Sequence, residues 1–193
     1  MITLDKAIQL ANEAHKNQWR NTSVIQTTQS IEDLKSTYSG CKIEETFLVN
    51  TYNLGKPYIS HPLAVMQMMD TEEEKIIAVL HDVFENCKNY ALSRAMDNSK
   101  FYIKNRETLD EYIITANIYQ ALTLLSKEKH TDYITYILNI VNGQLIPGLI
   151  DRRPNKLAIK VKIADMMHNI SETTNLTQKD KYLQSLPILL KGL

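Results

Sequence analysis

The chain has 193 residues, enough for one domain with a substantial hydrophobic core. Its 22 basic and 22 acidic residues balance to a formal charge of +0, which argues against a broad surface for extended nucleic acid. A small basic pocket for a phosphorylated ligand stays possible. Cys41 and Cys87 fit neither a zinc spacing nor a disulfide framework. No segment approaches the ~20 apolar residues of a membrane span, and the N-terminus lacks the features of a signal peptide, so we expect a cytoplasmic protein without a membrane partner.

The first third of the chain contains one clear helix. Apolar residues recur at three- and four-residue spacing over residues 3–19, which predicts that helix. Residues 21–54 are rich in Thr, Ser, Asn and Gln, and we expect a long irregular insertion there. It could hold a helical turn at 31–35 and a short strand or packed loop at 47–49. Residues 55–58, Gly-Lys-Pro-Tyr, are a turn signal.

The remainder of the chain is predicted to be helical. A capping box, Thr71 followed three residues later by Glu74, starts the central helix. One further helix is predicted to begin at Ser60, and short helical pieces are predicted around residues 90–96. Longer helices are predicted at 109–125, 155–170 and 180–190, and another, capped by Thr131 or Asp132, extends to residue 141. Gly143, Pro147, Gly148 and Pro154 mark one connection. The sequence therefore predicts an all-α fold, a single helical bundle over residues 1–193 with the insertion after its first helix.

The central helix carries polar groups on an otherwise apolar surface. Ala78, His81, Asp82 and Glu85 fall at i, i+3, i+4 and i+7, which is one helix face. A mostly apolar helix is a buried helix, and burying an imidazole and two carboxylates is costly unless a cation compensates them. A bound metal ion would do so. The alternative is a helix end with a capping histidine and solvated acids.

The late helix has a similar polar face. Asp165, His168 and Asn169 lie at i, i+3 and i+4 among apolar neighbours. An ion pair between Asp165 and Lys162, or a solvated face, is the alternative to a metal site here. Together with His61 at a helix start, the polar stretches offer two nitrogen and two oxygen ligands from three helices. Such a set suits Mn²⁺, Fe²⁺ or Zn²⁺, with open positions for water and substrate.

These motifs resemble a known family. The order His61, His81-Asp82, Asp165 is the pattern of HD-domain metal phosphohydrolases. The flanking segments resemble the hydrolase domain of RelA/SpoT-type proteins, and the length matches its small, hydrolase-only members; these segments are residues 14–20, 55–65, 78–86 and 161–169. The resemblance implies hydrolysis of the 3′-pyrophosphate of (p)ppGpp to GDP or GTP and pyrophosphate, usually with Mn²⁺.

The resemblance also implies a role for each site residue. The metal ligands would be His61, His81, Asp82 and Asp165. Glu85, paired with Asn86 in the catalytic motif, would orient or deprotonate the attacking water. Arg20 and Asn169 would bind the nucleotide substrate. Lys56 and Tyr58 are candidate substrate-binding residues at the pocket rim, although turn packing and a solvated charge explain them equally well.

Three features depart from the family pattern and keep other functions open. Asn86 replaces an expected Asp, Glu172 stands where the family often has a basic and hydroxyl-bearing run, and residues 21–54 lengthen a short join. We expect that insertion to lie at the mouth of the site. The alternatives are hydrolysis of another nucleotide (a nucleoside monophosphate, NADPH or a modified alarmone) and a weakly active nucleotide-binding HD domain.

Overall fold

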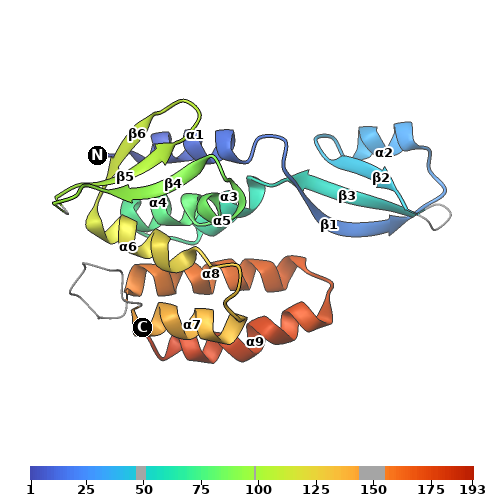
Figure 1. Cartoon of the computed structure of the whole chain (residues 1–193). Helices are drawn as coiled ribbons and strands as arrows, with labels where there is room; N and C mark the ends of the chain where they lie inside the picture. The colour runs from blue at the N-terminus through green and yellow to red at the C-terminus, as the bar shows by residue number, and fades with distance from the viewer. Residues whose placement is uncertain (47–50, 98, 144–154) are drawn as a thin grey trace.

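The computed structural model describes residues 1–46, 51–97, 99–143 and 155–193 (Figure 1). Its helices are α1 Leu4–Ala14, α2 Ile31–Thr37, α3 Ser60–Gln67, α4 Glu72–Leu80, α5 Val83–Asn86, α6 Ala116–Leu125, α7 Tyr133–Asn142, α8 Lys156–Glu172 and α9 Leu176–Leu190. Its strands are β1 Trp19–Gln26, β2 Lys42–Glu45, β3 Thr51–Pro57, β4 Tyr90–Arg94, β5 Phe101–Asn105 and β6 Glu111–Ile114. The expected elements at 47–49 and around Pro147, Gly148 and Pro154 lie outside the described residues. No helix in the described ranges is long and apolar enough to cross a membrane.

Helix α4 is the centre of the hydrophobic core. It packs against α1, α3, α6 and α8, and every residue from Ile76 to Leu80 is buried. Fully burying one such aliphatic side chain contributes about 1.5–3 kcal/mol. Because α4 is enclosed by helices, the polar residues that directly follow it lie close to the interior of the molecule.

The capping box at the start of α4 is confirmed. The Thr71 hydroxyl accepts from the backbone N–H of Glu74, and the Glu74 carboxylate accepts from the N–H groups of Thr71 and Asp70. Lys160 of α8 adds an ion pair at 2.9 Å. Burial alone would raise the pKa of Glu74, but the hydrogen bonds from Thr71 and Lys160 hold it below its usual 4.5.

The expected all-α class is wrong, because two antiparallel sheets accompany the helices. In the first sheet, with strand order β1-β3-β2, the strands come from residues predicted to be an irregular insertion and a turn. Strand β1 pairs with residues of β3 that are distant in sequence, as in the pairing of Arg20 with Lys56, so no local pattern predicts this contact. Strand β2 pairs with β3 over a shorter separation, as in the pairing of Glu45 with Tyr52. With α2, this sheet projects away from the helical body (Figure 1). Among the described side chains of the sheet, Arg20 lines the pocket described below, together with Tyr58, which directly follows β3.

The second sheet, with order β4-β5-β6, replaces two predicted helical segments. Residues 90–96 form β4 and the turn after it, and the predicted helix at 109–125 divides into β6 and α6. Leu109 has a left-handed φ of 63° in the turn before β6, which a continuous helix excludes. The Thr115 side chain then caps α6.

The capping box makes a stability prediction. We expect Glu74→Gln to lower the free energy of unfolding at pH 7 by about 1–2 kcal/mol, because a buried charged acceptor is lost. The folded-state pKa of Glu74 is depressed, so its charge stabilises the fold above the usual 4.5 and this contribution is lost as the pH falls below it. Urea titrations at pH 7 and pH 3 should therefore show a gap between wild type and variant that narrows in acid. Glu72→Gln, an exposed change in the same turn, is the control; an equal gap at both pH values would contradict this account.

Candidate metal centre

The structure brings the four predicted ligands together from three helical regions. His61 is the second residue of α3, His81 and Asp82 lie in the break between α4 and α5, and Asp165 is in the middle of α8. The His61 Nε2 atom is 3.0 Å from Asp165 Oδ1 and 3.7 Å from Asp82 Oδ2. The His81 Nε2 atom is 3.3 Å from Asp82 Oδ1 and 3.7 Å from Asp165 Oδ1. Both imidazoles thus direct Nε2 toward the same two carboxylates.

The orientation of His81 prepares one nitrogen to act as a ligand. Its Nδ1 atom is 2.7 Å from the carbonyl oxygen of Ala78, which can only accept, so Nδ1 donates its hydrogen there. In the neutral ring, the buried Nε2 atom then carries a lone pair, and it forms no hydrogen bond with the described residues. Burial alone would lower the pKa of His81, but the charges of Asp82 and Asp165 raise it to about 9. These carboxylates therefore attract a cation, whether a proton or a metal ion.

His61 is oriented by a second histidine that the sequence interpretation left without a role. Its Nδ1 atom lies 2.9 Å from Nδ1 of His168, so one ring donates to the other. Donation by His61 would leave its Nε2 atom free to bind a metal, the usual arrangement of a histidine ligand and its supporting partner. Burial lowers the pKa of His61, which favours the neutral ring. The only sequence signal for His168 was its position on the face of α8 that carries Asp165.

Asp165 forms the expected ion pair with Lys162 and also faces the candidate metal site. Its Oδ2 atom accepts from Lys162 at 2.7 Å, while Oδ1 faces His61 and accepts from Asn169 at 2.6 Å. Burial alone would raise the pKa of this carboxyl, but the Lys162 ammonium holds it well below its usual range. Asp165 is therefore ionised, with one oxygen paired to Lys162 and the other directed at the histidines.

These side chains could hold a metal ion. One donor atom each from His61, His81 and Asp165 lies within 4.8 Å of the other two, and all three residues are buried. Asp82 extends the set to two nitrogens and two carboxylates, a combination that fits Mn²⁺, Fe²⁺ and Zn²⁺. The Nε2 atom of His81 faces both carboxylates yet makes no hydrogen bond with the described residues, and this observation favours a cation here.

Asp82 is held by a short relay of hydrogen bonds. The Tyr58 hydroxyl donates to Asp82 Oδ2 at 2.8 Å and accepts from the Asn86 side-chain amide at 3.0 Å. The Tyr58 ring also stacks on His15, with ring centroids 4.7 Å apart. Tyr58 and Asn86, predicted for substrate binding and catalysis, thus contact each other beside a candidate ligand. Their predicted roles stay predictions.

A pocket of about 200 Å³ opens at this cluster. It is lined by Arg20, Tyr58, His61, Asp82, Glu85, Asn86, Asp165, Asn169 and Tyr182. Glu85 is exposed at the rim, and partial desolvation of its carboxyl together with the Asp82 charge raises its pKa. Tyr182 comes from α9, where no motif marked it. Lys56 is not in this lining; its ammonium lies 3.7 Å from Glu172.

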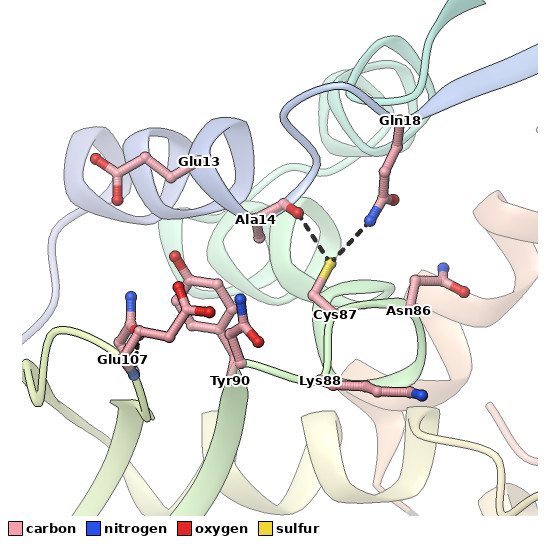
Figure 2. A pocket seen from close by; sticks show the side chains of 10 residues that line it. Glu13, Ala14, Gln18, Asn86, Cys87, Lys88, Tyr90 and Glu107 are labelled. Atoms are coloured by element: carbon pink, nitrogen blue, oxygen red, sulfur yellow. Dashed lines mark hydrogen bonds between the residues drawn. The ribbon is translucent and has the colours of Figure 1, made fainter.

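A larger pocket, about 470 Å³, lies where the end of α1, the residues after α5 and the start of β4 meet (Figure 2). Cys87 lies between α5 and the end of α1, where its thiol donates to the Ala14 carbonyl oxygen and accepts from the Gln18 amide. Burial raises the pKa of this thiol, so it is a poor nucleophile. Cys87 thus joins α5 to α1. Asn86 lines both pockets.

Comparisons with known proteins leave the family open. No protein-family model and no curated protein matches the chain. The resemblance to HD-domain phosphohydrolases therefore stays a prediction that rests on the motifs.

The cluster predicts bound metal. Purified protein should contain about one divalent ion per chain, because His61, His81 and Asp165 form one compact donor set. We expect His81→Ala and Asp165→Asn to lose most of it by elemental analysis while circular dichroism stays unchanged. His130→Ala, which removes an exposed histidine, is the control and should keep its metal. Full occupancy in both site variants would exclude the cluster as the metal site.

The relay through Tyr58 makes a separate prediction. Loss of its hydroxyl in Tyr58→Phe leaves Asp82 Oδ2 without a donor that orients it. Because partners that orient ligands typically contribute 10–100-fold in metal affinity, we expect Mn²⁺ to bind about tenfold more weakly. Competition with a fluorescent chelator measures this. Tyr182→Phe, in the same pocket, is the matched control; equal losses in both variants would assign the effect to the pocket rather than the relay.

Proposed function

We propose that the chain is a metal-dependent phosphohydrolase of a small nucleotide, and that it removes the 3′-pyrophosphate of (p)ppGpp to give GDP or GTP and pyrophosphate. The observation that carries the metal-dependent part is the convergence of the His61 and His81 Nε2 atoms on the carboxylates of Asp82 and Asp165. The choice of (p)ppGpp follows from the resemblance of the motifs.

The cluster would hold the ion, with Mn²⁺ expected and Fe²⁺ or Zn²⁺ as alternatives. When bound, such an ion lowers the pKa of water and neutralises phosphate charge. Within the chain, Lys162 keeps Asp165 ionised, and Tyr58 orients Asp82. The backbone carbonyl of Ala78 keeps the hydrogen of His81 on Nδ1, leaving Nε2 as the ligand atom.

The pocket residues would bind and activate the reactants. In the hydrolysis, the water oxygen bonds to phosphorus and the bond from phosphorus to the ribose 3′-oxygen breaks. A proton leaves the water, and the 3′-oxygen takes one up. Glu85 is the candidate base, because its carboxylate lies at the pocket rim and its raised pKa brings it nearer the working pH.

Asn169 connects the cluster to the nucleotide-binding side. Its amide donates to Asp165, and its carbonyl oxygen accepts from Arg20. Arg20 is thereby aimed along the pocket, where a guanidinium suits a phosphate or a base edge. We therefore assign Arg20 to substrate contact. Asn169 would position Arg20 and would also contact the substrate.

One observation favours a second candidate, a less highly charged nucleotide such as a nucleoside monophosphate. Glu172 places a carboxylate beside Arg20, which lines the pocket, and beside Lys56. A negative charge there disfavours a ligand with several phosphates. A nucleotide panel containing ppGpp, nucleoside monophosphates and NADPH separates the two candidates.

The decisive experiment is turnover by Mn²⁺-loaded protein. We expect pyrophosphate and GDP from ppGpp, and loss of this activity by about 10²–10⁴-fold in Glu85→Gln, the usual contribution of general acid–base catalysis. The metal content of that variant should stay normal. Turnover of a different nucleotide would transfer the assignment to the second candidate, and no turnover of any nucleotide would leave a nucleotide-binding domain.

A further inference from the structure

The base of the projecting sheet places two cations opposite each other. Arg20 of β1 pairs with Lys56 of β3 in the antiparallel register, and directly paired residues share one face of a sheet. The two side chains therefore reach out together from the point where the sheet meets the helical body. Neither strand alone supplies both positive charges; the pairing of β1 with β3 brings them together.

Glu172 bridges this pair of cations. Arg20 Nε is 3.6 Å from Glu172 Oε2, and Lys56 Nζ is 3.7 Å from Glu172 Oε1, so each carboxylate oxygen faces one cation. The side chains of Arg20 and Glu172 are each only 20% exposed, against 50% for Lys56. His168 also faces Glu172, with Nδ1 3.7 Å from Oε2. A phosphate group presents its oxygens to two cations in a similar way.

Helix stability does not explain Glu172. It is the last residue of α8, where the partial negative charge of the helix end disfavours an acid. A pocket of about 260 Å³, lined by Arg20, Asn169 and Glu172 among others, lies at this point. It shares Arg20, Asn169 and Tyr182 with the pocket at the metal cluster, so the two adjoin. Glu172 therefore lies where a ligand extending from the cluster would meet Arg20 and Lys56.

We propose that Glu172 is an internal anion that occupies the phosphate-binding position between Arg20 and Lys56, and that a phosphate-bearing ligand must displace it. Glu172 would thereby set the selectivity of the site for ligand charge. The assignment rests on the proposed function only in that the ligand is taken to carry phosphate. Two cations and one carboxylate leave a net charge of +1 at this position, and removal of the carboxylate charge leaves +2.

Binding of inorganic pyrophosphate tests the proposal directly. Isothermal titration calorimetry on chelator-treated, metal-free protein compares wild type, Glu172→Gln and Glu111→Gln. Glu111 is the matched control, an ion-paired acid on the second sheet, whose partner is Lys104. Removing one negative charge about 4 Å from a polyanion should tighten binding by about tenfold in Glu172→Gln, with no change in the control. Adding Lys56→Gln to Glu172→Gln should remove most of the gain.

Several results would overturn the proposal. These are equal or weaker pyrophosphate binding by Glu172→Gln, no detectable binding by that variant at millimolar pyrophosphate, and a gain that survives Lys56→Gln. Matching circular dichroism spectra will show that the variants are folded. The measurement needs no metal, nucleotide or turnover, so it succeeds or fails independently of (p)ppGpp hydrolysis.

Discussion

The site depends on one electrostatic constraint, the need for positive charge next to Asp82 and Asp165. Both carboxylates are directed at the interior end of α4, where desolvation of a charge is costly. The protein supplies part of the compensation through Lys162, which pairs with Asp165, and part through Tyr58, which donates to Asp82. The negative charge that remains also acts on His81, because the two carboxylates raise its pKa to about 9. A metal ion held by the same groups would compensate this charge.

The projecting sheet gives the site a wall that the helices do not provide. A helix presents one residue per turn to a given point, whereas paired strands present two side chains at the same level. The pairing of β1 with β3 uses this geometry at its base, where Arg20 and Lys56 face α8. The rest of the sheet extends away from the helical body (Figure 1). Residues between Arg20 and Lys56 thus determine the position of these two cations through strand register.

Local signals located most of the helices and the polar residues on or next to them, but they also predicted helix where β4 and β6 form. The Thr71–Glu74 capping box, the Asp132 cap of α7 and the polar face of α8 all involve residues within one turn of each other. The sheets could not be predicted in this way, because a strand is stabilised by a partner distant in sequence. In β5, buried Phe101 and Ile103 do alternate with less buried residues, but five residues are too few to distinguish a strand.

The same limit applies to the contacts within the site. The helical spacing predicted His81 and Asp82 on one face of the central helix, but α4 ends at Leu80 and both residues lie in the break before α5. The structure nevertheless brings them together with Asp165 of α8. The partnership of His61 with His168 joins residues 107 positions apart, and only the packing of α3 against α8 creates it. The contact of Tyr58 with Asn86 likewise depends on how β3 enters α3 beside α5.

The contacts of Asn86 give a physical reason for an amide at that position. The Tyr58 hydroxyl has a single hydrogen, and it donates that hydrogen to Asp82 while accepting from Asn86. An ionised carboxylate at position 86 could only accept, so it would compete with Asp82 for the same hydrogen and add a further negative charge. The amide avoids both effects, because it donates and is neutral. Asn86 is thus matched to the use of Tyr58 as a donor to Asp82.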